Sequence, residues 1–385
     1  MTQIWIIYPF TANTLGTTEN YFWESNRTNA FFVALRRIQK ETGSQVSVVY
    51  LTDAAESHES IQDEIRFRFF PVSVGRGRGV GGFGKQWSIA LISRLIRERP
   101  SLVFLFIGGG WFALTLAVIC KGLGIPYCPI VAGWGVATRR SLRWYYGNAL
   151  RTIVHTEAHK QRFANAGVNT QNFMVMPMGV DTQLFRAKPQ SAYLRVKDDV
   201  RFIHVGRIVP GKNLIGALKV LSQVRGVYPN VVLDVVGPIS DQEYWIKAQQ
   251  FISGHSLEKQ VCFHGKVENA VLPALYAQAD LMLFPTLSES FGFVIAESMA
   301  CGTPVVALRG AGSPEEIIED GVDGILADEE QLAERTIALL EQPHELARMG
   351  VQAAQKIRRC YSHEQTYRDI RKLLREAVTE STVTR

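Results

Sequence analysis

Two carboxylates in one short segment could act on a bound ligand. Glu289 and Glu297 have seven residues between them, and they flank the start of an apolar helix that we expect to begin at Gly292 and to stop at Gly302. The first N–H groups of a helix carry the positive end of its dipole, so they suit phosphate groups. One acid on the entry loop and a second two turns down the helix could hold the rest of a nucleotide-linked ligand.

A pair of cations upstream fits the same kind of ligand. Arg207 follows Gly206 at the end of a predicted strand, and Lys212 opens a helix together with Gly211 and Asn213. Fixed cations at the carboxyl end of a strand could stabilise the charge that a leaving diphosphate gains as its bond to a sugar breaks. Taken alone, the two cations would fit ordinary surface charges on a turn as well. The acids downstream favour a binding site.

Together these segments closely resemble the signature of retaining glycosyltransferases of family 4, which have the GT-B fold. The resemblance implies that Glu297 holds the donor ribose. It places Glu289 near the donor sugar as a binding and electrostatic residue and not as a conventional nucleophile. The implied catalytic residues are Glu289, Arg207 and Lys212. The implied donor-binding residues are Gly16, Gly206, Lys266, Val267, Ser290, Phe291, Gly292, Phe293, Val294 and Glu297.

Three of these assignments depend on loops outside the main signature. The resemblance places the loop of Lys266 and Val267 against the nucleobase, although a simple exposed lysine fits Lys266 equally well. Gly16 is the candidate for close approach to the donor phosphate or sugar. Many relatives have a histidine where this chain has Ala132 and Gly133, so one donor-sugar contact of the family is missing here.

Composition sets the broad class. The chain has 385 residues, enough for two domains, and 46% of them are hydrophobic. A net charge of +6 suits a nucleotide donor or an anionic membrane surface, and no nucleic-acid motif accompanies it. The five scattered cysteines form no C-x-x-C pair and indicate reduced thiols in a cytosolic protein. Residues 4–10 lack a basic leader and fit a first strand better than a signal peptide.

Three further patterns have competing interpretations. Residues 102–120 carry no charge and could span a bilayer, but a glycine run at 108–110 favours a buried strand followed by a helix.

The segment 73–87 is rich in glycine and arginine and fits a loop that meets an anionic acceptor or a membrane. A plain flexible loop fits this composition equally well, and a segment that binds nucleic acid fits it less well. His155 and His159 have the spacing of a helical zinc pair without a third ligand, so we expect no metal.

The remaining chain alternates strands and helices, which predicts doubly wound parallel sheets. We expect an α/β protein with two Rossmann-like domains facing a cleft: residues 1–190 with the last helix at about 360–385, which would bind the acceptor, and residues 191–359, which would bind the donor. Helices are expected at 29–42, 87–99, 111–122, 157–166, 214–225, 241–251, 270–278 and 362–378. Strands are expected at 4–8, 46–51, 102–107, 127–131, 151–155, 200–205, 231–236, 261–264 and 281–284.

The leading hypothesis is a retaining glycosyltransferase that moves a sugar from a nucleoside-diphosphate donor to a hydroxyl of a glycan or glycolipid, in surface polysaccharide or glycoconjugate synthesis. We expect no cofactor besides the donor, with UDP favoured over GDP. We also expect a cytoplasmic location, with a peripheral contact to the inner face of the cytoplasmic membrane left open. Two alternatives remain: a GT-B sugar-nucleotide epimerase, and a sugar-nucleotide-binding subunit without catalytic activity.

Overall fold

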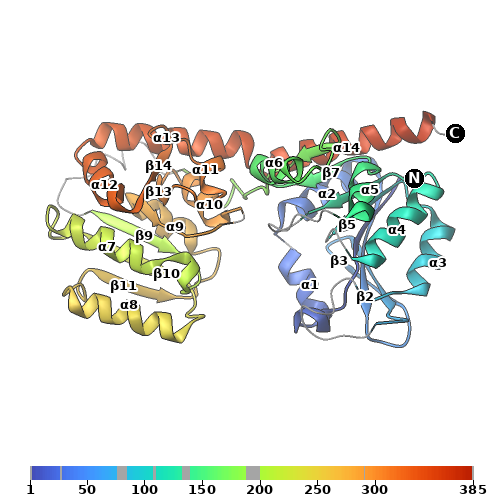
Figure 1. Cartoon of the computed structure of the whole chain (residues 1–385), viewed down its shortest axis with the longest axis horizontal. Helices are drawn as coiled ribbons and strands as arrows, with labels where there is room; N and C mark the ends of the chain where they lie inside the picture. The colour runs from blue at the N-terminus through green and yellow to red at the C-terminus, as the bar shows by residue number, and fades with distance from the viewer. Residues whose placement is uncertain are drawn as a thin grey trace. The chain divides into compact units, whose positions relative to one another are not determined.

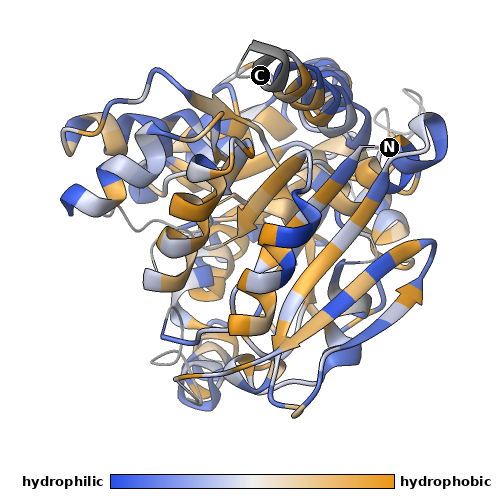
Figure 2. Ribbon diagram, turned by 90° about the vertical axis from the view of Figure 1, so that its right-hand side faces the viewer, coloured by the Kyte–Doolittle hydropathy of each residue, from blue (hydrophilic) through white to orange (hydrophobic). Residues whose placement is uncertain are grey.

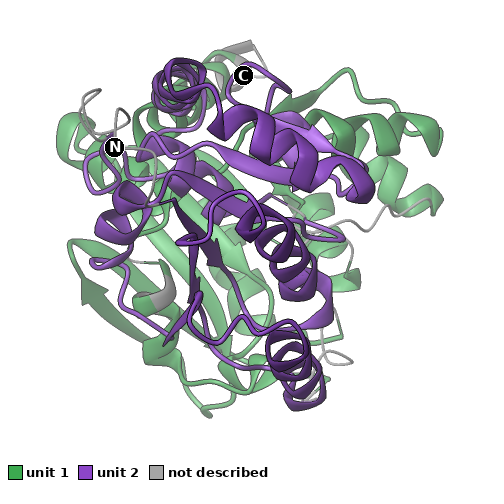
Figure 3. Ribbon diagram, turned by 90° about the vertical axis from the view of Figure 1, so that its left-hand side faces the viewer, with its two compact units in different colours: residues 1–179, 363–385 green, residues 180–362 purple. Residues whose placement is uncertain are grey.

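The computed structural model describes residues 2–26, 28–75, 85–106, 110–131, 139–187, 200–289 and 291–383. These residues form two compact units, Met1–Gly179 with His363–Arg385, and Val180–Ser362 (Figure 3). The chain therefore passes from unit 1 to unit 2 once and returns before its last helix. At these crossings the N–H of Val180 donates to the carbonyl of Tyr361 at 2.7 Å, within unit 2.

Unit 1 is built on a sheet of eight described strands in the order β3-β4-β2-β1-β5-β6-β7-β8. All neighbouring pairs are parallel except β3 and β4, which form an antiparallel hairpin at one edge. The strands are β1 (Gln3–Tyr8), β2 (Gln45–Thr52), β3 (His58–Gln62), β4 (Ile65–Pro71), β5 (Leu102–Phe106), β6 (Tyr127–Ile130), β7 (Thr152–Val154) and β8 (Phe173–Val175).

Helices cover both faces of this sheet because its central strands are apolar on both sides. Along β1, Ile4 and Ile6 join the core under α2 and α14, whereas Trp5 and Ile7 join the core under α3, α4 and α5. In Figure 2 the strands are largely orange and most blue lies on loops and outer helix faces. The elements are η1 (Ala12–Leu15), α1 (Glu19–Asn26), α2 (Ala30–Thr42), α3 (Ile89–Glu98), α4 (Trp111–Gly122), α5 (Arg140–Gly147), α6 (Glu157–Asn165) and α14 (His363–Val383).

The last helix, α14, packs on the first part of the chain (Figure 1). Ile370 and Leu373 are fully buried beside Leu35 of α2. Ion pairs lie at both ends of the contact, from Arg37 to Glu364 at 2.6 Å and from Arg151 to Glu376 at 2.9 Å. The helix is therefore part of the fold of unit 1 although it follows all of unit 2 in the sequence.

Unit 2 has a second parallel sheet, with its described strands in the order β11-β10-β9-β12-β13-β14. Two such sheets confirm the predicted α/β fold class. The strands are β9 (Arg201–Val205), β10 (Val232–Val236), β11 (Val261–Gly265), β12 (Leu281–Phe284), β13 (Val305–Leu308) and β14 (Gly324–Ala327). The helices are η4 (Pro210–Lys212), α7 (Leu214–Arg225), α8 (Gln242–Gly254), α9 (Leu272–Gln278), α10 (Phe293–Ala300), α11 (Pro314–Ile317), η5 (Glu329–Gln331), α12 (Leu332–Leu340) and α13 (Pro343–Cys360).

The uncharged segment 102–120 folds as predicted, into strand β5 and helix α4. Residues 107–109, which include two glycines of its run, lie outside the described residues, as do 76–84 of the glycine and arginine loop and both Ala132 and Gly133. Among the described residues, no helix is both long enough and apolar enough to cross a bilayer.

Candidate active site

The loop after β9 carries two of the predicted catalytic residues, Arg207 and Lys212. Gly206 ends the strand, and Asn213 takes a left-handed conformation with φ of 52° between η4 and α7. The side-chain Oδ1 of Asn213 accepts a hydrogen bond from the N–H of Gly216 at 3.1 Å. Its side-chain Nδ2 donates to the carbonyl of Pro285 at 2.9 Å. Asn213 therefore caps α7 and at the same time ties this loop to the loop that follows β12.

A second set of bonds joins the same two loops. The carbonyl of Gly211 accepts from the N–H of Leu287 at 3.0 Å and from the hydroxyl of Thr286 at 3.0 Å. Because β9 and β12 are neighbours in the sheet, both loops leave from its carboxyl edge. Lys212 is consequently held next to the chain that leads to Glu289.

The loop after β13 fixes the main chain of Glu289. The N–H of Glu289 donates to Ala311 at 2.9 Å, and its carbonyl accepts from Ser313 at 3.2 Å. Gly312 of this loop forms a parallel bridge with Glu289. Three loops from neighbouring strands thus determine where the first acid lies.

The side chains of Lys212 and Glu289 form an ion pair. They are 20% and 13% exposed, so the pair is shielded from bulk water on most sides and is screened less than a surface pair. The Lys212 ammonium also lies 5.4 Å from the ring centroid of Phe284, at the end of β12. The structure therefore brings these two predicted catalytic residues into direct contact.

Arg207, the third predicted catalytic residue, is exposed. The structure gives its guanidinium no hydrogen bond or ion pair with any described residue. It follows Gly206 directly, on the loop that also carries Lys212. Its donors are available to an anionic ligand, in contrast to the Lys212 ammonium, which is paired with a carboxylate.

Gly292 shapes the start of α10. It has φ of 83°, and a Cβ there would lie 2.9 Å from Cδ1 of Ile295 and 3.3 Å from Cγ of Glu289. Any other residue would be strained and would push on the acid. Phe291 is buried, whereas Phe293 is 41% exposed at the first position of the helix, followed by a half-buried Val294. Ser290 lies outside the described residues.

Glu297 lies further along α10, where Tyr276 of α9 donates to its Oε2 at 3.2 Å. Burial raises the pKa of Glu297 to about 7, and the hydrogen bond from Tyr276 only partly offsets this. The carboxyl group is thus partly protonated at neutral pH. Hydroxyl donors from a ligand would favour its charged form.

Three predicted donor-binding residues are not brought to the Lys212–Glu289 pair by any recorded contact. Lys266 is exposed and Val267 is half-buried, on the loop that follows β11. Gly16 belongs to unit 1, where it ends η1 with φ of 67° and with open space beside it. Their contacts to a donor stay predictions.

The two histidines with zinc-like spacing have other roles. The Nδ1 of His155 lies 3.0 Å from the carbonyl of Met176, and burial lowers the pKa of this imidazole. His159 is buried in the first turn of α6, where its N–H donates to the hydroxyl of Thr156 at 3.1 Å. Thr156 caps this helix.

Several residues that shape the site gave weaker signals in the sequence. Gly237, after β10, is one: a Cβ there would lie 1.9 Å from the carbonyl oxygen of Gly206, so only glycine fits. A lone glycine after a strand does not reveal which loop it meets. Thr286 and Tyr276 act through contacts set by the order of strands and helices, which local sequence does not show.

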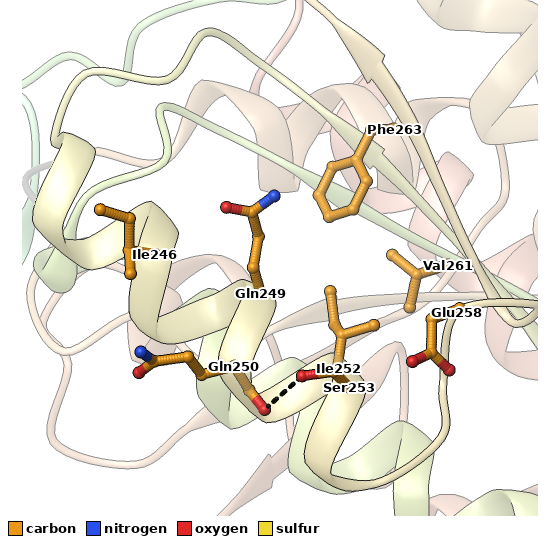
Figure 4. Close-up of a pocket in the computed structure, with 8 residues that line it drawn as sticks. All are labelled: Ile246, Gln249, Gln250, Ile252, Ser253, Glu258, Val261 and Phe263. Atoms are coloured by element: carbon orange, nitrogen blue, oxygen red, sulfur yellow. Dashed lines mark hydrogen bonds between the residues drawn. The ribbon is translucent and has the colours of Figure 1, made fainter.

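A cavity of about 560 Å³ lies elsewhere in unit 2, between α8 and the edge strand β11 (Figure 4). No predicted site residue lines it. Its lining combines apolar side chains with amides and one acid: Ile246, Gln249, Gln250, Ile252, Ser253, Glu258, Val261 and Phe263. The Ser253 hydroxyl donates to the carbonyl of Gln250 at its rim, at 3.2 Å.

Comparisons with known proteins find related sequences and a related fold. A family model described as Glycosyl transferases group 1 matches residues 186–356, and one described as Glycosyltransferase Family 4 matches residues 29–184. The chain is 30% identical to a GDP-mannose-dependent alpha-(1-6)-phosphatidylinositol monomannoside mannosyltransferase of Mycolicibacterium smegmatis, over 57% of this chain and 61% of that protein. It is 32% identical to a D-inositol 3-phosphate glycosyltransferase of Paenarthrobacter aurescens, over 47% of this chain and 45% of that protein.

These matches span about half of the length of the curated relatives. Among solved structures, the fold is similar to that of HepE from Anabaena in complex with UDP, with a TM-score of 0.72, 20% identity, and coverage of 97% of this chain and 99% of that chain. The same protein in complex with UDP-glucose gives a TM-score of 0.65 at 19% identity, with the same coverage. At these identities the likeness concerns the fold.

The pKa of Glu297 predicts a pH dependence of stability. The unfolded carboxyl group has a pKa of about 4.3, so between that value and about 7 the folded state binds more protons than the unfolded state. The free energy of unfolding should therefore fall as pH rises through this range, by about 3 kcal/mol from this group. Glu297→Gln should remove that decrease, as measured by denaturant unfolding at pH 5, 6, 7 and 8.

Glu334→Gln is the matched control because Glu334 is exposed on α12 of the same unit. It should leave the pH profile of unfolding unchanged. A Glu297→Gln profile that still parallels the wild type would contradict the assignment.

Proposed function

The chain belongs to glycosyltransferase family 4, and on this premise we propose that it transfers a sugar from a nucleoside-diphosphate sugar to a hydroxyl of a glycan or glycolipid. The observation that carries the proposal is the Lys212–Glu289 ion pair, with Arg207 exposed on the same loop as the lysine. In the proposed reaction the sugar keeps its anomeric configuration.

Arg207, Lys212 and Glu289 would contact different parts of the donor. Arg207 and Lys212 would bind the diphosphate, whose charge grows as the bond to the sugar breaks, so that they stabilise the transition state more than the ground state. A diphosphate brings its own negative charge to Lys212, which would loosen the hold of this cation on Glu289. The carboxylate could then interact with the sugar, and we assign it no covalent bond to the sugar.

Glu297 and the start of α10 would hold the nucleoside side of the donor. The ribose hydroxyls can donate to the half-buried Glu297 carboxylate, which would lower its pKa and favour the charged form. The first N–H groups of α10, at Phe293 and Val294, lack partners within the helix and suit a phosphate oxygen. UDP is the proposed nucleotide: HepE, which has a similar fold, was solved with UDP and with UDP-glucose, whereas the mannosyltransferase of Mycolicibacterium smegmatis depends on GDP-mannose.

The acceptor is proposed to bind to unit 1 and to be carried by a glycan or a lipid. Three helices of this unit, α3, α4 and α5, cover one face of the sheet (Figure 1). Their outer side carries five exposed apolar residues, Ile89, Ile96, Trp111, Val118 and Trp144. It also carries exposed cations, Arg97, Lys121, Arg140 and Arg143. We call these residues the α3–α5 surface.

This composition suits the surface of an anionic membrane. Tryptophans favour the boundary between lipid and water, and each lysine or arginine near a charged bilayer adds about 1 kcal/mol. Glu98, the single acid within the three helices, is paired with Arg68 at 2.8 Å. We propose that the α3–α5 surface gives the enzyme a peripheral membrane contact, as a lipid-linked acceptor would require.

A donor screen tests the proposed reaction. UDP should raise the melting temperature of the full chain more than GDP does, since binding to the folded state adds about 2.7 kcal/mol of stability at a ligand concentration 100 times Kd. Incubation with UDP-sugars and a panel of glycan and lipid-linked acceptors should then release UDP. Failure of every nucleotide to stabilise the protein would refute the proposal. Binding without turnover would point to a binding subunit, and donor conversion without acceptor to an epimerase.

Replacing Arg207 separates ligand binding from folding. Arg207→Ala should weaken UDP binding about 10- to 100-fold, because a hydrogen bond to a charged group contributes about 1.5–3 kcal/mol. The free energy of unfolding should stay within about 0.5 kcal/mol of the wild type, since this exposed side chain has no recorded protein partner. Isothermal titration calorimetry and denaturant unfolding measure the two quantities.

Lys247→Ala is the control for this variant, because Lys247 is exposed on α8 of the same unit. It should bind UDP like the wild type. If Arg207→Ala binds UDP with the affinity of the wild type, Arg207 does not contact the nucleotide.

The membrane contact predicts salt-sensitive binding to vesicles. The wild type should sediment with vesicles of phosphatidylglycerol and phosphatidylcholine, and less so as salt rises, since salt screens the cations. A double variant, Trp111→Ser with Trp144→Ser, should lose most of this binding. Tyr21→Ser, which removes an exposed aromatic residue of α1, should keep it. Equal sedimentation of the double variant and the wild type would contradict the proposal.

A further inference from the structure

The two outer strands of the unit 2 sheet bring together three side chains that can bind a metal ion. Asp234 of β10 lies in register with Cys262 of β11. His264 is two residues further along β11, where the pairing with β10 shifts register, and its Nε2 lies 2.8 Å from Oδ1 of Asp234. One oxygen of Asp234, the sulfur of Cys262 and one ring nitrogen of His264 all lie within 4.8 Å of one another.

The two faces of β11 differ, because alternate residues point in opposite directions. Val261 and Phe263 line the cavity against α8 on one side. Cys262 and His264 stand on the other side, and both are exposed. The potential ligands are therefore reachable from solvent, whereas Asp234 beneath them is 2% exposed.

Asp234 is already part of a polar network. Its Oδ2 accepts from Nη1 of Arg201 at 2.6 Å, and its Oδ1 lies 2.8 Å from Nε2 of His264. These two bonds satisfy the buried carboxylate. They also fix its orientation and hold the imidazole edge toward it, with the thiol of Cys262 close to both.

We propose that Asp234, Cys262 and His264 bind a divalent cation of the zinc class. Zinc takes thiolate, imidazole and carboxylate ligands together, whereas magnesium and calcium prefer oxygen alone. On binding, the thiol of Cys262 releases its proton to solvent. The proton that Nε2 of His264 shares with Asp234 also leaves this nitrogen, and the neutral ring carries its proton on Nδ1, so that Nε2 can bind the ion. The fourth position faces solvent and takes a water molecule.

The adjustment that the ion requires is small. Zinc bonds of about 2.0–2.3 Å place tetrahedral ligand atoms about 3.3–3.7 Å apart, so ligand atoms now within 4.8 Å of one another must draw together by about 1.5 Å at most. Oδ1 of Asp234 and Nε2 of His264, now 2.8 Å apart, must separate by about 0.5 Å. Side-chain rotation of the exposed Cys262 on an edge strand can supply this. Arg201 keeps its bond to Oδ2 and orients the carboxylate from behind, as outer partners of metal ligands commonly do.

None of the three ligands is among the predicted catalytic or donor-binding residues, although His264 lies two residues before Lys266, which is one of them. Lys212 and Glu289 follow β9 and β12, whereas the three ligands come from β10 and β11. The inference therefore does not rest on the proposed glycosyltransfer, and an inactive protein could still bind the ion. Sequence spacing alone shows only Cys262 and His264, because Asp234 comes from the neighbouring strand.

Cobalt provides a direct test because thiolate bound to Co²⁺ gives a charge-transfer absorption band. The full-length chain, treated with a chelator and dialysed, should bind one Co²⁺ and show this band, and one equivalent of Zn²⁺ should bleach it. Cys262→Ser should lose the band. His264→Gln should weaken Zn²⁺ binding by at least about 10- to 100-fold in competition with a chromogenic chelator, since the loss of an outer partner of a metal ligand already has an effect of this size.

Cys360→Ser is the control, since Cys360 is a partly exposed cysteine outside the cluster. It should keep both the band and the Zn²⁺ affinity. Circular dichroism should show that each variant is folded, since Cys262 and His264 are exposed on an edge strand and Cys360 is partly exposed at the end of α13. A wild type that shows no band with equimolar Co²⁺, a band that survives Cys262→Ser, or a band lost in Cys360→Ser would each overturn the proposal.

Discussion

The candidate active site depends on hydrogen bonds that join loops at the carboxyl edge of the unit 2 sheet. The carbonyl of Gly211 accepts two of them from the loop after β12. The main chain of Glu289 takes part in two more with the loop after β13. Neighbouring parallel strands end at the same edge, so three loops can share these bonds although they are far apart in the sequence. The ion pair of Lys212 and Glu289 rests on this frame.

Glycine is required where these loops come closest. A side chain at Gly237 would collide with the carbonyl of Gly206, and one at Gly292 would meet Ile295 and Glu289. Both glycines also have positive φ, which other residues rarely adopt. The loops can thus pack closely because glycine has no side chain. The hydrogen-bonded backbone of these loops then positions the charged side chains of the site.

Local sequence predicted the boundaries of helices whose ends are marked by glycine or asparagine. Helices α4 and α7 begin and end at the predicted residues, because glycine or asparagine marks their starts and glycine lies at or just after their ends. Strand β3 was not predicted, since an antiparallel edge strand with mostly polar residues lacks the apolar pattern of the buried strands. The pairing of Lys212 with Glu289 was also beyond local sequence, because it follows from β9 lying beside β12.

The two acids of the signature segment show why residue type alone does not assign a role. Glu289 sits in an ion pair with Lys212, on a loop fixed from two sides. Glu297 has no recorded cation partner; burial raises its pKa to about 7, and its recorded hydrogen bond comes from the neutral hydroxyl of Tyr276. An arriving anion would compete with Glu289 for its cation, whereas arriving hydroxyl donors would favour the charged form of Glu297. A diphosphate linked to a ribose supplies both the anion and the hydroxyl donors. One ligand would therefore weaken the ion pair of Glu289 and also favour the charged form of Glu297.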